Sequence, residues 1–186
     1  MTSLTAFTVL VVLVGLERLA ELVVSKRNAA WSMQHGGRES GQGHYPVMVV
    51  LHTGFLVAML VEAWVRRPDV PGALAWSMLA LVLAAQALRW WCIAALGRRW
   101  NTRVIVVPGL PPVTGGPYRF LSHPNYVAVV VEGVALPMVH ACWITALVFT
   151  VANAALLTVR IRVEDAALAT LPPAAPAARP AGPVDA

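Results

Sequence analysis

Charged side chains are scarce in this sequence. Asp, Glu, Lys and Arg make up 12% of its 186 residues, about half the share found in an average soluble domain. Hydrophobic residues make up 58%, and they gather in long runs between short polar clusters. This composition argues against a soluble protein. It predicts a single integral membrane domain over residues 1–170, with no separate soluble domain.

Lysine and cysteine are also nearly absent. Lys26 is the one lysine among fourteen basic residues, and the arginines stand in short clusters beside apolar runs. Such clusters orient membrane helices, so we expect contact with membrane lipids and no binding of nucleic acid. The two cysteines, Cys92 and Cys142, lie inside apolar runs. We expect them to pack there and to form neither a disulfide nor a metal site.

Four apolar regions are long enough to cross a bilayer, which takes about 17–25 residues. They cover residues 4–24, 45–65, 72–96 and 126–159. The last region is too long for one span, and Pro137 with the three residues after it predicts a tight turn. We therefore predict an all-α integral membrane protein with about five transmembrane helices, the last two forming a helical hairpin.

The segments between these regions are rich in glycine, proline and polar residues. We expect irregular structure at residues 31–43 and 106–116, where glycine and proline interrupt regular patterns. The tail at residues 171–186 consists mostly of proline and alanine. A low-complexity segment of this kind is predicted to be disordered.

The densest cluster of polar residues lies at the start of the fourth predicted helix. Residues 113–126 read VTGGPYRFLSHPNY. Pro124 suits the first turn of a helix, where its missing N–H costs nothing. His123 and Tyr126, three residues apart, then lie near one face. The segment predicts either a binding site or an interfacial belt of aromatic and basic residues, which is common at membrane surfaces.

A second polar segment, RIRVED at residues 160–165, leaves the fifth predicted helix. Arg160 and Glu164 are four residues apart, so both side chains can face one site. Alternatively, the segment is a basic membrane anchor with a single salt bridge along the helix.

The two segments together resemble the isoprenylcysteine carboxyl methyltransferase family. GPYRFLSHPNY, a helical hairpin and RIRVEDAAL follow one another in the family's order, although Ser122 stands where the family has an arginine before His-Pro. The stretches ERLAELVVSKRN, GRRWNTRVIVVPG and HPNYVAVVVE are similar to a bacterial branch of this family. That branch methylates long-chain alkylpyrones or alkylresorcinols and is encoded beside type III polyketide synthases.

The resemblance implies S-adenosylmethionine as the methyl donor and a cytosolic cofactor site. By position, Arg160 would face the acceptor, and the residues around the cofactor would be Arg103, Val113, Tyr118, His123, Pro124, Asn125, Tyr126 and Glu164. Aromatic faces suit a sulfonium, and a carboxylate can accept hydrogen bonds from ribose hydroxyls. Methyl transfer chiefly requires that donor and nucleophile be aligned in a dry site.

Glu132 is the other candidate for chemistry, because it lies two turns into the fourth predicted helix. An ionisable residue inside a membrane span is a functional hypothesis by default. Glu132 could orient or deprotonate an acceptor hydroxyl, or it could simply pair with Arg89 of the third helix. Glu17, Arg18 and Glu21 lie near the predicted end of the first span, where charged residues more often anchor than act.

The sequence therefore predicts a membrane O-methyltransferase that acts on a lipophilic acceptor, an alkylpyrone or alkylresorcinol, with a possible functional link to a type III polyketide synthase. The alternatives are a prenylcysteine carboxyl methyltransferase, an NADPH-dependent enzyme like the sterol reductases, which share His-Pro-Asn-Tyr, and a small transporter or scaffold. The abundance of arginine, alanine and proline is typical of a GC-rich genome, which favours the cytoplasmic membrane of a bacterium.

The basic clusters also predict a topology that can be tested. Residues 98–119 and the C-terminal segment should be cytosolic, and the N-terminus and the turn near His140 external, although Arg66 and Arg67 disagree. Single cysteines placed at positions 110 and 140 of a cysteine-free variant should react with an impermeant thiol reagent from opposite sides. External labelling at position 110 would overturn the orientation.

Overall fold

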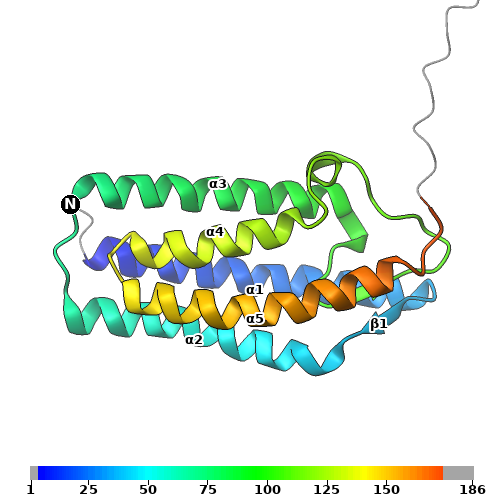
Figure 1. Ribbon diagram of the computed structural model, residues 1–186, viewed down its shortest axis with the longest axis horizontal. Coiled ribbons are helices and arrows are strands. Elements are labelled where there is room, and N and C mark those ends of the chain that lie inside the picture. Colours follow the sequence, from blue (N-terminus) through cyan, green and yellow to red (C-terminus); the bar gives the residue numbers. More distant parts are fainter. Residues whose placement is uncertain (1–3, 174–186) are drawn as a thin grey trace, which may run out of the picture.

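The computed structural model describes residues 4–173. Within them the chain forms five α-helices, namely α1 (Leu4–Gln34), α2 (Tyr45–Arg66), α3 (Gly72–Leu96), α4 (Pro124–Met138) and α5 (Trp143–Leu168). The helices run along the long dimension of the molecule as one bundle (Figure 1). The predicted helical fold is confirmed. Most of the tail that we predicted to be disordered lies outside the described residues.

The predicted helical hairpin is present. Residues 139–142 form the turn between α4 and α5, and the Cys142 N–H donates to the Pro137 carbonyl at 3.0 Å. Glu62 of α2 accepts hydrogen bonds from the N–H and the hydroxyl of Thr145, both at 2.7 Å. A carboxylate is favourable at the first turn of a helix. The neighbouring helix α2 therefore fixes the beginning of α5.

Part of the sequence that we predicted to be irregular forms a small sheet. β1 (Arg38–Ser40) pairs antiparallel with β2 (Val104–Val106), and Glu39 lies opposite Ile105. The valines of β2 are buried and pack against Ala167 of α5. The prediction was wrong at β1 because this strand depends on a partner more than 60 residues away, which a local pattern cannot reveal.

Among the described residues, three segments are long and apolar enough to cross a membrane. They are Gln42–Arg66, Gly72–Arg99 and Trp143–Leu168, which contain α2, α3 and α5 in turn. α4 is apolar but shorter. α1 is ten residues longer than we predicted, which places Glu17, Arg18 and Glu21 near its middle and not at a span end. The total of five spans therefore stays a prediction.

Charged side chains of α1, α3 and α4 meet inside the bundle. Arg89 donates two hydrogen bonds to Glu21, at 2.6 and 2.8 Å, and both residues are buried. Arg18 bonds to Glu21 at 2.8 Å and to Glu132 at 3.0 Å. The predicted pair between Glu132 and Arg89 was wrong, because Glu21 takes the Arg89 guanidinium. Since an unpaired charge is costly in apolar surroundings, this ion network fixes α1 against α3 and α4.

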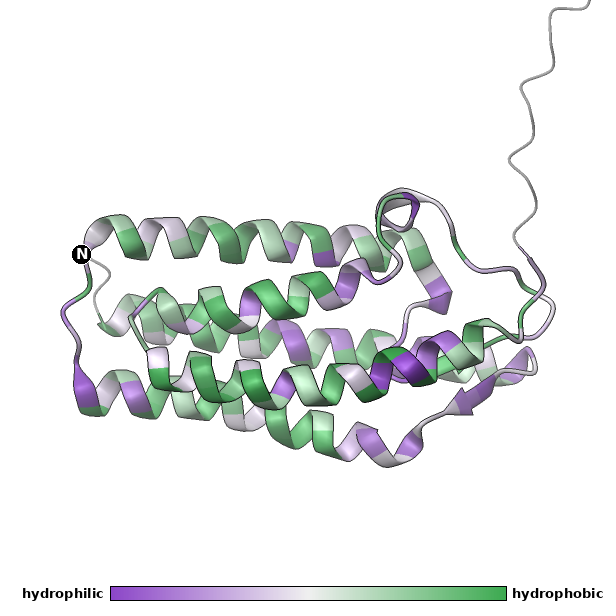
Figure 2. Cartoon of the chain, in the orientation of Figure 1, coloured by the Kyte–Doolittle hydropathy of each residue, from purple (hydrophilic) through white to green (hydrophobic). Residues whose placement is uncertain are grey.

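α4 is much shorter than its partner in the hairpin. It has 15 residues against 26 in α5, a difference of about 16 Å of helix. α5 therefore extends past the point where α4 begins (Figure 1). Hydrophilic residues gather at this end of the bundle, on the last turns of α5 and on β1 (Figure 2). The short helix leaves room for a polar pocket at one end of an apolar bundle.

The ion network should contribute much of the stability of the bundle. Replacing Arg89→Met leaves the buried Glu21 with Arg18 as its partner, and breaking a buried pair costs about 3 kcal/mol. Arg66→Met is the matched control, because its partner Glu62 keeps the hydrogen bonds from Thr145. Unfolding in detergent should show the larger loss for Arg89→Met. Equal losses in the two variants would contradict this role.

Candidate active site

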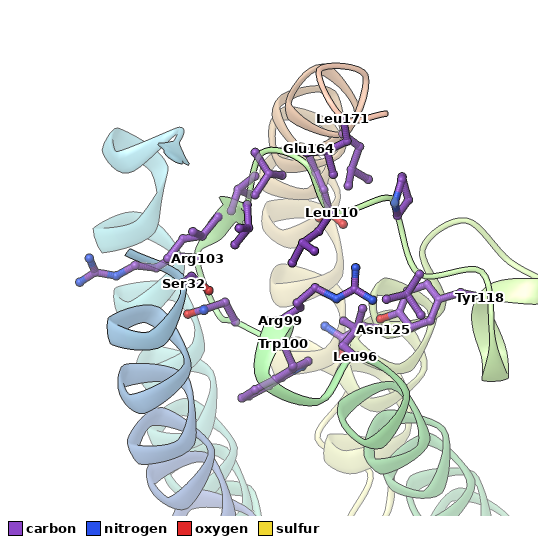
Figure 3. Close-up of a pocket in the computed structure, with 18 of the residues that line it drawn as sticks. Ser32, Leu96, Arg99, Trp100, Arg103, Leu110, Tyr118, Asn125, Glu164 and Leu171 are labelled. Atoms are coloured by element: carbon purple, nitrogen blue, oxygen red, sulfur yellow. The ribbon is translucent and has the colours of Figure 1, made fainter. Parts of the chain in front are cut away.

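A polar pocket lies at the end of the bundle where α5 extends past α4. It contains about 930 Å³ of empty space, part of which is open solvent. Its walls come from the end of α1, the α3–α4 connection, the start of α4 and the end of α5 (Figure 3). Eight of the predicted site residues line it, namely Arg103, Val113, Tyr118, His123, Asn125, Tyr126, Arg160 and Glu164.

Two predicted site residues lie outside the polar pocket. Pro124 is fully buried at the first position of α4, so it shapes the wall without contributing to the lining. Glu132 lies two turns further along α4, where it lines a smaller inner cavity together with Arg18 and His52. The structure therefore does not bring Glu132 to the other predicted residues.

The carboxylate of Glu164 connects the two polar segments. It accepts a short hydrogen bond from the Tyr126 hydroxyl and lies 3.5 Å from His123 Nδ1. The other ring nitrogen of His123 lies 3.0 Å from Asp165 Oδ1. The rings of His123 and Tyr126 stack with their centroids 5.4 Å apart, which confirms that they share a face.

His123 is therefore held between two carboxylates. The hydrogen bond to Glu164 raises its pKa above the ordinary value of 6.5, Asp165 acts in the same direction, and partial burial opposes them. Tyr118 also has a raised pKa, chiefly because burial disfavours the phenolate. The raised pKa values favour the protonated forms of the His123 ring and of the Tyr118 phenol.

Arg160 is buried in the wall of the pocket. Its residue is 6% exposed, and its guanidinium donates to the Thr102 carbonyl and to the Met48 sulfur, both at 3.0 Å. The guanidinium also lies 5.9 Å from the centre of the Tyr126 ring. Within residues 4–173 no carboxylate lies at ion-pair distance from it, so the salt bridge to Glu164 that we considered does not form.

A chain of hydrogen bonds holds the carbonyl that Arg160 uses. The Thr102 N–H donates to Ser25 Oγ at 3.0 Å, and the hydroxyls of the two residues lie 2.8 Å apart. Asn28, one turn further along α1, donates to the Trp100 carbonyl at 2.8 Å. Ser25 and Asn28 thus attach the α3–α4 connection to α1. Sequence reasoning missed them, although the spacing of Glu21, Ser25 and Asn28 marks one polar face of a helix.

Two more arginines line the pocket from the α3–α4 connection. Arg103 bridges to Glu39 of β1 at 3.4 Å and lies over the Tyr45 ring. Arg99, which the sequence did not single out, donates to the Pro111 carbonyl at 2.7 Å. The pocket is therefore rich in positive charge, with Glu164 as the acidic group in its lining.

The chemistry of this lining fits S-adenosylmethionine, which the family resemblance implies. The cofactor carries a sulfonium, an amino-acid end and ribose hydroxyls, and the pocket offers aromatic faces, guanidinium groups and a carboxylate. Asn125 Oδ1 is moreover buried without a hydrogen-bond partner among the described residues. Such a group calls for a polar ligand or water.

A comparison with known families matches residues 78–170, half of the chain, to the isoprenylcysteine carboxyl methyltransferase (ICMT) family. The chain belongs to this family. It is 35% identical over 162 residues to YpbQ of Bacillus subtilis (strain 168), an uncharacterized protein, covering 87% of this chain and 96% of that protein. An uncharacterized Haemophilus influenzae protein is 24% identical over 157 residues, covering 84% and 91% of the two chains. No solved structure matches the chain significantly.

Family membership indicates an integral membrane methyltransferase. The matched region contains α4, α5 and the connection before them, which supply most of the polar pocket. The family match gives no support to a reductase, a transporter or a scaffold, which are the other classes that the sequence left open. The two relatives are uncharacterized, so they do not identify the methyl acceptor.

The contacts of His123 with two carboxylates predict how the stability of the protein depends on pH. Because the pKa of His123 is raised on folding, its contribution to stability is complete below 6.5 and is lost as the pH rises through the higher folded-state value. Thermal unfolding in detergent from pH 6 to 9 should show this loss in the wild type and a smaller one in His123→Gln. The exposed His35→Gln should behave like the wild type. Parallel curves for wild type and His123→Gln would refute the pairing.

Proposed function

We propose that this protein transfers a methyl group from S-adenosylmethionine to an acidic oxygen of a lipophilic acceptor at the cytosolic face of a bacterial membrane. The observation that carries the proposal is the buried guanidinium of Arg160, which has no carboxylate partner among the described residues and lines a pocket suited to the cofactor. S-adenosylmethionine supplies a methyl group on a positively charged sulfur. The protein has to align that methyl with the acceptor oxygen and exclude water.

The donor half of the pocket is formed by Glu164 and the aromatic residues around it. An ionised carboxylate is an acceptor only, so Glu164 suits hydroxyl or ammonium donors of the cofactor. The faces of Tyr118 and Tyr126 can attract the sulfonium. Tyr126 and His123 already orient Glu164 before any ligand arrives. These residues bind and orient the cofactor, and none of them has to exchange a proton.

Arg160 favours an acceptor that binds as an anion. Burying a guanidinium without a counter-charge is costly, whereas an anionic oxygen beside it offsets that cost. The planar fork of the side chain also suits an enolate or a carboxylate. An acceptor that binds as its anion is already nucleophilic, so no general base is required. The position of Glu132 outside the pocket, paired with Arg18, is consistent with this account.

Among the acceptors predicted from the sequence, an alkylpyrone fits this requirement best. Its enolic hydroxyl is conjugated with a lactone carbonyl, so it ionises far more readily than the phenol of an alkylresorcinol. A prenylcysteine carboxylate is also an anion, and the family to which the chain belongs keeps it as the second candidate. A type III polyketide synthase is the functional partner that would supply an alkylpyrone.

The apolar part of the pocket suits the chain of a lipid. Leu96, Leu110, Leu168 and Leu171 line it, and Leu110 is also exposed on the surface. Phe120 and Leu121, next to the polar segment, are exposed as well. An alkyl chain can follow these side chains into the bilayer while its acidic head reaches Arg160. Each buried methylene adds about 0.8 kcal/mol, so activity should fall as the chain is shortened.

Arg160→Gln separates the roles of the two halves of the pocket. With an alkylpyrone, kcat/KM should fall about 100-fold, because the variant loses a buried charge-assisted contact to the acceptor. The dissociation constant for S-adenosylhomocysteine should change less than about threefold, because Glu164 and Tyr126 remain. Radiolabelled methyl transfer in membranes and calorimetry on purified protein measure the two quantities. Arg162→Gln, an exposed neighbour on the same helix, is the matched control.

The same assay discriminates between the acceptors. An alkylpyrone, an alkylresorcinol and a prenylcysteine of equal chain length should be methylated in the order pyrone, prenylcysteine, resorcinol. Labelling of a chainless, water-soluble pyrone as efficient as that of the lipid would count against a lipophilic substrate. If Arg160→Gln weakens cofactor binding as much as acceptor turnover, Arg160 does not have the proposed role.

A further inference from the structure

Arg99 lines the polar pocket, but the proposed function gives it no role. It follows α3 in the short turn Gly97–Arg99, and the hydrogen bond from its Nη1 to the Pro111 carbonyl, at 2.7 Å, holds the guanidinium in place. Its exposure is intermediate, whereas the neighbouring Arg98 is exposed and does not line the pocket. Within residues 4–173 the structure pairs Arg99 with no carboxylate.

The charges of the pocket do not balance without a ligand. Arg103 pairs with Glu39, and the ring of His123 lies beside Glu164 and Asp165. In the part of the chain that the structure describes, two guanidinium groups of the lining have no carboxylate at ion-pair distance, Arg160 on α5 and Arg99 after α3. A buried or half-buried cation of this kind is a site for an anion. Two such cations on different elements of the pocket predict two anionic groups, of which the acceptor supplies one.

The side chains that line the pocket with Arg99 indicate what the second anion is attached to. Arg99, Asn125 and Tyr118 line the same pocket (Figure 3). Asn125 Oδ1 is a buried acceptor without a partner among the described residues, so it calls for a donor and not for a second anion. The Arg99 guanidinium can donate to a carboxylate, and the unsatisfied Asn125 oxygen can accept from an ammonium. These two groups stand on one carbon in a free α-amino acid.

We propose that Arg99 and Asn125 bind the amino-acid end of the methyl donor, Arg99 taking its carboxylate and Asn125 Oδ1 its ammonium. This inference rests on the proposed function, since it requires S-adenosylmethionine in the pocket. It assigns the two free guanidinium groups to different ligands, the cofactor at Arg99 and the acceptor at Arg160. The nucleoside end is then left to the remaining lining, including Glu164.

The experiment compares two ligands that differ in the amino-acid end. S-adenosylhomocysteine has the carboxylate and the ammonium, whereas 5′-methylthioadenosine lacks both and keeps the nucleoside and the sulfur. Calorimetry on the purified protein in detergent gives a dissociation constant for each ligand with wild type, Arg99→Gln, Asn125→Leu and Arg98→Gln. The ratio of the two constants isolates the amino-acid end. Binding of methylthioadenosine also reports whether a variant is folded.

Arg99→Gln should raise the dissociation constant for S-adenosylhomocysteine about 10- to 100-fold, the loss expected for hydrogen bonds to a charged group. Its constant for methylthioadenosine should stay within about twofold of wild type, and Arg98→Gln should change neither. Asn125→Leu should show the same selective loss on a smaller scale. Arg99→Lys should recover part of the affinity, because it keeps the charge and loses the fork.

The contrary outcomes are distinct. An equal loss for both ligands in Arg99→Gln would mean that Arg99 acts by holding Pro111, and no loss for either would mean that it does not touch the cofactor. Both results overturn the inference and leave the proposed function intact. A wild-type protein that binds neither ligand would overturn the proposed function itself, and the assignment of Arg99 with it.

Discussion

The ion pair between Glu21 and Arg89 is the contact on which the position of the site depends. It joins α1 to α3 inside the bundle, where Arg18 and Glu132 belong to the same ion network. One turn along α1, Ser25 then meets Thr102, whose carbonyl receives the Arg160 guanidinium. A buried pair in apolar surroundings thus sets the register of α1, and a hydrogen-bonded loop connects α1 to the guanidinium to which we assign the acceptor.

The second constraint is geometric. Because α4 is short and its turn into α5 is tight, the end of α5 stands free beside the start of α4 and can hold Arg160 and Glu164 over a pocket. The two residues share one helical face but have different partners, the Thr102 carbonyl for Arg160 and the Tyr126 hydroxyl for Glu164. In the proposed reaction one helix would serve both the acceptor half and the cofactor half of the site, without a salt bridge between Arg160 and Glu164.

The long apolar run with Pro137 predicted the hairpin. The family resemblance predicted eight of the residues that line the pocket, among them Tyr118, His123 and Tyr126, which are close in sequence. The contacts that sequence reasoning missed join distant segments, as Ser25 does with Thr102, 77 residues away. The sequence could not decide whether Glu132 pairs with Arg89, because that pairing also depends on contacts between distant segments. Several acids surround Arg89, and only the packing of α1 decides that Glu21 takes it.

Arg160 has no carboxylate at ion-pair distance among residues 4–173, which also bears on how the proposed reaction would end. The guanidinium would hold the acceptor through a negative charge, and methylation of that oxygen removes the charge. The product is then a neutral ether or ester facing a cation that it can no longer compensate. Its affinity for the pocket falls at the same moment as its preference for hydrocarbon rises. The chemical step itself would expel the methylated lipid sideways into the bilayer, so turnover would need no separate conformational change for release.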